Sequence, residues 1–147
     1  MKQPRNSILQ GMMGNLSEIS GEALEKKFGS YLMEGETIQT GFQLIVDVIV
    51  FTDRRLITFD KQDAVSPKMR VDSIYLDSIT QVSLETAGIG IDDSRITITY
   101  ITSPYFRASH GVICEARTYE FPKRYDIRPL YSLLQKIAYD NHIAINS

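Results

Sequence analysis

The chain has 147 residues, of which 43% are hydrophobic and 23% charged, and its formal net charge is −2. This length suits one domain that buries enough surface to fold without disulfides or metal ions. The composition excludes disordered, collagen-like and coiled-coil chains, and no apolar run reaches the ~20 residues of a membrane-spanning helix. A sequence pI of about 5.7 also argues against the broad basic surface of a nucleic-acid-binding protein.

Cysteine usage and the first residues indicate where the protein works. Cys114 is the only cysteine, so no internal disulfide can form. The first residues are too broken in hydrophobicity for the apolar core of a signal peptide. We therefore expect a cytoplasmic protein.

Two short helical patterns open the chain. Apolar residues fall near helical spacing between Ile8 and Leu16, although two glycines weaken this segment. A second pattern places Leu24, Phe28 and Tyr31 on one helix face, and Ser20 offers an N-terminal cap.

The middle of the chain alternates between apolar and polar residues, as strands with one buried face do. We predict seven strands, at residues 37–42, 44–51, 56–59, 69–75, 79–84, 95–101 and 112–121. A final helix follows Asp126, a predicted cap, and tolerates Pro129 in its first turn. Its core-facing stripe consists of Ile127, Leu130, Leu134 and Ile137.

These elements predict a mainly β (α+β) fold. Seven short strands with turns between them suggest an antiparallel barrel or sandwich, and the last helix would plug an open end or cover a face. We expect a single domain, in which an N-terminal helical segment, residues 1–33, packs on a barrel with its C-terminal helix, residues 34–147.

The stretch from Gly41 to Ile57 resembles the strand–turn–strand signature of the bacterial pleckstrin-homology (PH) domain family. Residues 11–15, 60–62, 78–80 and 85–88 resemble further segments of that family, so the resemblance covers roughly residues 11–137. It implies a PH-like seven-stranded barrel capped by a C-terminal helix, ring-shaped homo-oligomers and no enzymatic activity. The hairpin from Thr102 to Glu115 is longer than in the family, and it could cap or block a neighbour in a ring.

Two groups of residues are candidates for a partner or oligomer surface. The first is a compact charged turn formed by Asp53, Arg54 and Arg55. It is either a solvated hairpin tip with a local Asx turn or a contact to a partner, where arginine is favoured. The second lies in a long loop and consists of Tyr105, Phe106 and Arg107. It is either an interaction hot spot or a segment that folds back on the barrel.

Other chemistry finds little support in the sequence. His110 and Cys114 offer two ligands where structural zinc takes four, so we expect no metal, cofactor or catalytic site. Asp47 lies within an apolar run, and we expect it to face solvent or a subunit interface. Phosphoinositide binding is disfavoured because the first hairpin, Ile38 to Phe51, contains no lysine or arginine.

The sequence therefore favours a non-enzymatic, self-assembling protein–protein interaction module, with itself and an unidentified protein as partners. The alternative is a membrane-surface adaptor that lies on lipid through the segment from Ile8 to Leu16. The polar face of that segment lacks lysine and arginine, which counts against this alternative. An enzyme with its pocket at the barrel mouth is a third class, which no set of residues supports.

Overall fold

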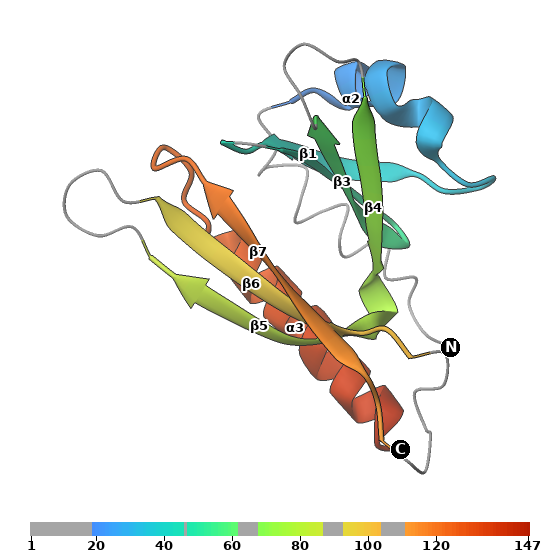
Figure 1. The fold of residues 1–147 in the computed structure, drawn as a ribbon, viewed down its shortest axis with the longest axis vertical. Helices are drawn as coiled ribbons and strands as arrows, with labels where there is room; N and C mark the ends of the chain where they lie inside the picture. Colours follow the sequence, from blue (N-terminus) through green and yellow to red (C-terminus); the bar gives the residue numbers. More distant parts are fainter. Residues whose placement is uncertain (1–18, 46, 62–67, 87–92, 104–110) are drawn as a thin grey trace. The chain divides into compact units, whose positions relative to one another are not determined.

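The computed structural model describes residues 19–45, 47–61, 68–86, 93–103 and 111–147. It forms two compact units that divide after Ser73 (Figure 1). Within these ranges, no helix combines the length and the apolar character that a membrane span requires.

The first unit contains helix α2 (Gly21–Phe28), a 3-10 turn (Gly29–Tyr31) and a four-stranded antiparallel sheet. The strands, which follow one another in the sheet in chain order, are β1 (Ile38–Gln43), β2 (Val48–Thr52), β3 (Arg55–Lys61) and β4 (Met69–Tyr75), whose last two residues lie beyond the division between the units.

Helix α2 begins and packs as its sequence predicts. The Ser20 side chain accepts a hydrogen bond from the Ala23 amide at 3.2 Å and caps the helix. The helix buries two of its side chains in a core with three residues of the sheet, and the five are Leu24, Phe28, Val50, Ile57 and Phe59. Gly41 lets the helix approach β1, because a Cβ there would lie 2.6 Å from the Leu24 side chain.

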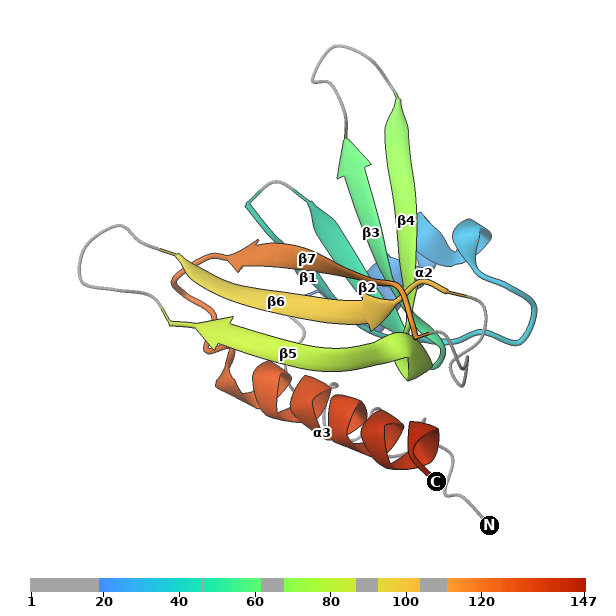
Figure 2. The same cartoon turned by 60° about the horizontal axis from the view of Figure 1, so that its bottom comes forward.

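The second unit contains a 3-10 turn (Leu76–Ser78), a three-stranded antiparallel sheet and helix α3 (Arg128–Ile145). The strands lie in the order β5 (Ile79–Glu85), β6 (Ser94–Ile101) and β7 (Cys114–Phe121). Figure 2 shows α3 running alongside β5, with which it makes most of its contacts.

The apolar stripe of the last helix is confirmed, since its four predicted residues are all buried. The helix has Ile127 at its N-cap, one residue later than predicted. The Asp126 carboxylate still accepts a hydrogen bond from the Arg128 amide at 3.2 Å. Asn141 donates from Nδ2 to the carbonyls of Leu76 and Ile79, both at 2.8 Å, and so fixes the helix to the start of β5.

The predicted fold class is confirmed in its seven strands, which the described residues form as sheets of four and three, and in its C-terminal helix. The predicted second strand was placed too early. It begins at Val48 rather than Leu44, because the Leu44 amide donates to the Asp47 carbonyl at 2.8 Å and closes the β1–β2 turn. Asp47 therefore lies in a turn, where it is half-buried. The division into residues 1–33 and 34–147 stays a prediction.

Candidate functional site at the β2–β3 turn

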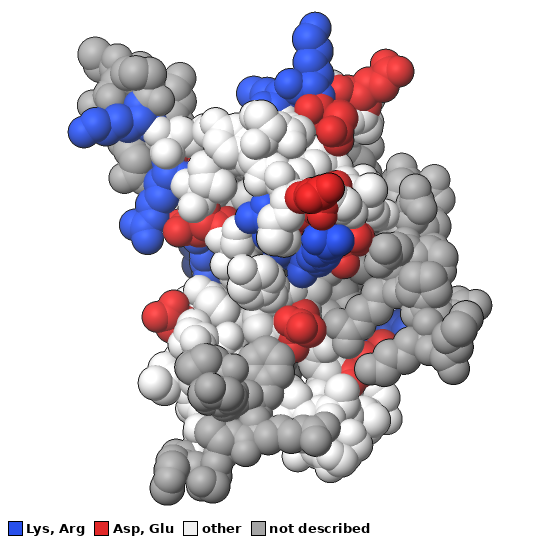
Figure 3. Space-filling model, turned by 90° about the vertical axis from the view of Figure 1, so that its right-hand side faces the viewer, with Lys and Arg blue, Asp and Glu red and all other residues white. Residues whose placement is uncertain are grey.

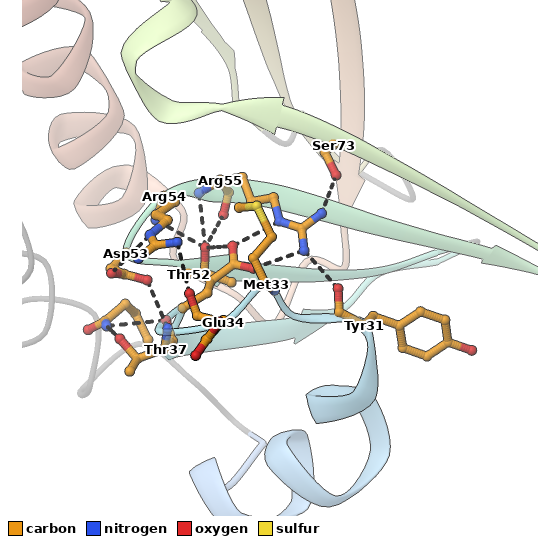
Figure 4. Close-up of polar contacts among 11 residues, drawn as sticks. Tyr31, Met33, Glu34, Thr37, Thr52, Asp53, Arg54, Arg55 and Ser73 are labelled. Carbon is orange, nitrogen blue, oxygen red and sulfur yellow. Dashed lines mark hydrogen bonds and ion pairs between the residues drawn. The ribbon is translucent and has the colours of Figure 1, made fainter.

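The charged turn predicted from the sequence connects β2 to β3. Asp53 and Arg54 form the turn, and Arg55 is the first residue of β3. Figure 4 shows these residues gathered against the segment from Tyr31 to Thr37. The turn therefore holds a segment that precedes it by about 20 residues, as in the bond from Arg54 to Glu34.

Local hydrogen bonds in the turn are made by a threonine. The Thr52 hydroxyl accepts from the amides of Arg54 at 3.1 Å and Arg55 at 2.9 Å. The Asp53 carboxylate instead accepts a bond from the Thr37 amide at 2.8 Å. Thr52 was not among the predicted site residues, although a hydroxyl just before a turn is a recognisable signal for such bonds.

Arg55 connects three parts of the first unit. Its Nε and Nη2 atoms donate to the two carboxylate oxygens of Glu36 at 2.8 and 2.9 Å. It also donates at 2.8 Å to the Tyr31 carbonyl and to the Ser73 hydroxyl. Its side chain is only 13% exposed and that of Glu36 is 0% exposed, so this ion pair is a structural connection.

Glu36 is held in its charged form. Burial raises its pKa, but hydrogen bonds from Arg55, the Thr52 hydroxyl and the Met33 amide, together with the Arg55 charge, outweigh that effect. The net result lowers the pKa of Glu36 from 4.5 to about 2. The buried carboxylate therefore fixes the chain from Met33 to Glu36 against the β2–β3 turn.

Arg54 is the most accessible of the three predicted charges. Its side chain is 45% exposed, whereas that of Asp53 is 8% exposed. Its Nη1 atom donates to the Glu34 carbonyl at 3.2 Å. Gly35 has a φ of +79°, and a Cβ there would lie 3.2 Å from Arg54 Nη2, so this close contact favours glycine.

Exposed apolar side chains lie on the same segment. Tyr31 packs its ring edge-on against Phe59, with centroids 5.2 Å apart, yet it is 43% exposed, and Met33 is 40% exposed. The helical pattern predicted a stripe on one helix face that places Tyr31 with Leu24 and Phe28. The stripe ends early because α2 stops at Phe28 and the chain continues as a 3-10 turn. Exposed aromatic, methionine and arginine side chains are enriched at protein interfaces.

Several predicted residues fall outside the part of the chain that the structure describes. These are the loop residues Tyr105, Phe106 and Arg107, together with His110 and the segment from Ile8 to Leu16. Their predicted roles stay predictions. Among the described residues, no three His, Cys, Asp or Glu side chains gather into a set that could hold a metal ion.

Charges are mixed in sign on the face of the molecule that Figure 3 shows. In Figure 3, acidic and basic side chains lie beside one another, and neither sign covers a broad area. The β1–β2 hairpin runs from Ile38 to Thr52, close to the predicted bounds, and contains no lysine or arginine. Its turn therefore lacks the cationic groups that would bind a phosphorylated headgroup.

Comparison with known proteins places this fold among bacterial relatives. The sequence matches the bacterial PH domain family over residues 7–138. It is 41% identical over 91 residues to the uncharacterized protein YjqA of Bacillus subtilis (strain 168), a match that covers 62% of this chain and 73% of YjqA. The uncharacterized protein YozO of the same organism is 34% identical over 73 residues, which cover 50% of this chain and 63% of YozO.

Solved structures show the same fold. A pleckstrin homology domain from Shewanella amazonensis SB2B is similar with a TM-score of 0.58 and 24% identity, over 79% of this chain and 96% of that domain. A DUF1696 family protein with a pleckstrin-homology domain from Shewanella loihica PV-4 has a TM-score of 0.61 at 22% identity, over 83% and 96%. A PH domain containing protein from Exiguobacterium sibiricum 255-15 has a TM-score of 0.62 at 20% identity, over 85% and 62%. These similarities confirm the predicted PH-like fold.

Proposed function

The chain belongs to the bacterial PH domain family, and on that premise we propose that it is a non-enzymatic interaction module that assembles with copies of itself. The observation that carries this proposal is the segment from Tyr31 to Thr37, which the buried Glu36–Arg55 pair fixes in place. That segment presents Tyr31 and Met33 to solvent, and the half-exposed Arg54 is bonded to its Glu34 carbonyl.

Rigidity makes this surface suitable for binding. A contact surface that is already ordered loses less conformational entropy when a partner binds. The bonds to Glu36 and to the Tyr31 carbonyl order the backbone on both sides of Met33. A mobile loop with the same side chains would bind more weakly.

The shifted titrating groups of the described residues support a non-catalytic function. The pKa of Asp126 is lowered and that of Arg128 is raised because the two side chains bind each other. Glu36 is held by Arg55 in the same manner. Each of these pKa shifts thus comes from an ion pair. The pKa of a catalytic group is instead shifted to suit proton transfer or nucleophilic attack.

A ring-shaped homo-oligomer in the cytoplasm completes the proposal. A ring presents one weak site several times, so an unidentified protein partner would gain avidity without new contacts. The single cysteine is compatible with a reducing compartment, because the fold depends on no internal disulfide.

The mass of the full-length protein in solution tests this function. Size-exclusion chromatography with light scattering should give a multiple of the 16.7 kDa chain mass. A strict monomer across the accessible concentrations would contradict the proposal. Replacing Met33→Ser together with Arg54→Ala should lower the assembled fraction, because both side chains are exposed on the fixed segment.

A matched pair on helix α3 provides the control. Ile143→Ser together with Lys136→Ala also removes one exposed apolar and one exposed basic side chain. This pair should leave the mass unchanged. Equal effects of the two pairs would show a general loss of surface affinity rather than a contact at the β2–β3 turn.

A further inference from the structure

The edge strand β4 differs from its neighbours in exposure. It is the outermost strand of the four-stranded sheet as the described residues define it, and five of its seven residues are exposed. By contrast, β2 exposes none of its five residues. The outer edge of such a strand offers backbone amides and carbonyls to which another strand can bind.

The charges on β4 are arranged symmetrically about its third residue. Arg70 Nε lies 3.0 Å from Asp72 Oδ2, and the two side chains are 67% and 32% exposed. They are two residues apart in a strand, so they lie on one face with Val71 between them on the other. The exposed apolar residues Met69 and Val71 share that other face.

We infer that β4 pairs antiparallel with β4 of a second copy of this chain, around a twofold axis at Val71. This inference rests on the proposed self-assembly and adds to it a second, twofold contact, distinct from the surface at the β2–β3 turn. In this register Arg70 lies opposite Asp72 of the second copy, and Asp72 lies opposite its Arg70. Val71 faces its own counterpart, and Met69 faces Ser73.

Charge selects this register over its neighbours. In an antiparallel pair around a twofold axis, residues that face each other lie on the same face of the sheet. The register can therefore change only if a different residue lies on the axis. An axis at Arg70 or at Asp72 would place two like charges directly opposite each other, which is destabilising. An axis at Val71 creates two opposite-charge pairs instead, and a slip in register is strongly disfavoured where side chains specify it.

The second outer strand of the described structure with charges in this spacing is β7. There Glu115 accepts a hydrogen bond from Tyr100 at 3.2 Å, and the Arg117 guanidinium lies over the Tyr119 ring. Those charges are already bound to their own sheet. The charges of β4 form an ion pair with each other at 3.0 Å, and a second copy can offer an opposite charge to each of them.

A twofold contact is compatible with a ring. Contacts that use the same patch on both copies close a dimer, whereas head-to-tail contacts close a ring. If this chain also forms rings, pairing through β4 would join two rings into one assembly. Whether the assembly is a dimer or a pair of rings, loss of the β4 contact should halve its mass.

Charge reversal in the full-length chain tests the inference. Arg70→Asp leaves two aspartates on each strand, and Asp72→Arg leaves two arginines. Each variant alone places like charges opposite each other at both positions, so the dissociation constant should rise about tenfold or more. At concentrations where the wild type is assembled, light scattering should then show half its mass.

An equimolar mixture of the two variants separates pairing between copies from effects within one chain. In the mixture, the two aspartates on β4 of one chain face the two arginines on β4 of the other, so the wild-type mass should return. Neither chain regains its own intrachain ion pair in the mixture. A variant that had merely failed to fold would stay at low mass after mixing.

Cysteine crosslinking gives an independent measurement. In a Cys114→Ser background, Val71→Cys should form an oxidised dimer, because residues opposite each other in antiparallel strands lie about 4.5–5.5 Å apart at Cα. Met69→Cys in the same background is the matched control. Its two copies would lie roughly 13 Å apart along the paired strands and should not crosslink.

The outcomes distinguish this inference from the proposed function. A monomeric wild type would overturn both. An assembled wild type whose mass neither reversal changes, or for which Met69→Cys crosslinks as readily as Val71→Cys, would overturn the β4 pairing and leave self-assembly standing. Half mass for each reversal, recovery on mixing and selective crosslinking at Val71 would support it.

Discussion

At the scale of single residues, burial separates three charges that are adjacent in the sequence. Arg55 is almost enclosed by Glu36, Tyr31 and Ser73, and the Asp53 carboxylate binds the Thr37 amide. Arg54 keeps nearly half of its side chain in solvent. Arg55 and Asp53 therefore hold the segment in place, and Arg54 is available to a partner.

The buried Glu36–Arg55 pair makes stability depend on pH. Because the folded pKa of Glu36, about 2, lies below its ordinary 4.5, its contribution is fully present above about pH 4.5 and is lost as the pH falls towards 2. Glu36→Gln should therefore destabilise the protein by about 3 kcal/mol at neutral pH. The difference between variant and wild type in urea denaturation should shrink as the pH falls from 4.5 to 2.

The exposed Asp126–Arg128 pair is the control for that prediction. It has the same chemistry at 2.9 Å, but both side chains are largely in solvent. Asp126→Asn should change stability much less than Glu36→Gln, because solvent weakens the attraction between exposed charges. A Glu36→Gln deficit that stays constant down to pH 2 would contradict the role assigned to this carboxylate.

The sequence could predict the charged turn but not its partners. Asp53, Arg54 and Arg55 follow a β-branched run, which is a local signal for a turn. Glu36 precedes Arg55 by 19 residues, and no spacing rule connects the two. Their pairing depends on the fold that brings β3 next to the segment after α2, so it became visible only in the structure.

At the scale of elements, one polar side chain fixes helix α3 to its sheet. Asn141 is buried and donates to the carbonyls of Leu76 and Ile79 at the turn before β5. Asn141→Leu keeps similar volume but leaves two buried carbonyls without this donor. The expected loss is about 1–3 kcal/mol in the free energy of unfolding, measured by chemical denaturation.

Asn146, the C-cap residue of the same helix, is the matched control. It also donates to a carbonyl, that of His142 at 2.8 Å, but it is exposed at the helix end, where water can replace the bond. Asn146→Leu should therefore change stability by no more than about 0.5 kcal/mol. Equal losses for the two variants would mean that the buried hydrogen bonds of Asn141 stabilise the protein no more than the exposed bond of Asn146 does.

The alternation of apolar and polar residues predicted the positions of the strands better than the positions of the turns between them. The strand at Met69–Tyr75 was predicted with its observed bounds. The start of β2 was missed because Leu44 and Ile45 are apolar residues in a turn, where glycine, proline or asparagine is usual. Alternation also could not show that β4 lies at the sheet edge, because strand order depends on pairing between distant segments.

At the scale of the whole molecule, charge favours protein partners over anionic surfaces. The net charge is −2, and acidic and basic side chains alternate on the face in Figure 3. Attraction to a membrane or a nucleic acid grows with clustered basic residues. This arrangement instead suits short-range contacts between complementary strands, as proposed for β4.

Lipid binding provides the last prediction. The full-length protein should co-sediment no better with phosphoinositide vesicles than with matched vesicles that carry another anionic lipid. The reason is the β1–β2 hairpin, Ile38 to Thr52, which contains no lysine or arginine, whereas a phosphorylated headgroup requires several charge-assisted donors. A phosphoinositide-binding PH domain sedimented in parallel is the positive control.

Two contrary results would have different meanings. Selective sedimentation with phosphoinositide would contradict the argument from the hairpin and require basic groups from elsewhere in the chain. Binding to all vesicles would instead implicate the segment from Ile8 to Leu16, since an amphipathic helix binds through its apolar face. In that case Leu9→Glu together with Met12→Glu should abolish sedimentation, whereas Met33→Ser with Arg54→Ala should not, because the membrane would be bound by a surface other than the one proposed for self-assembly.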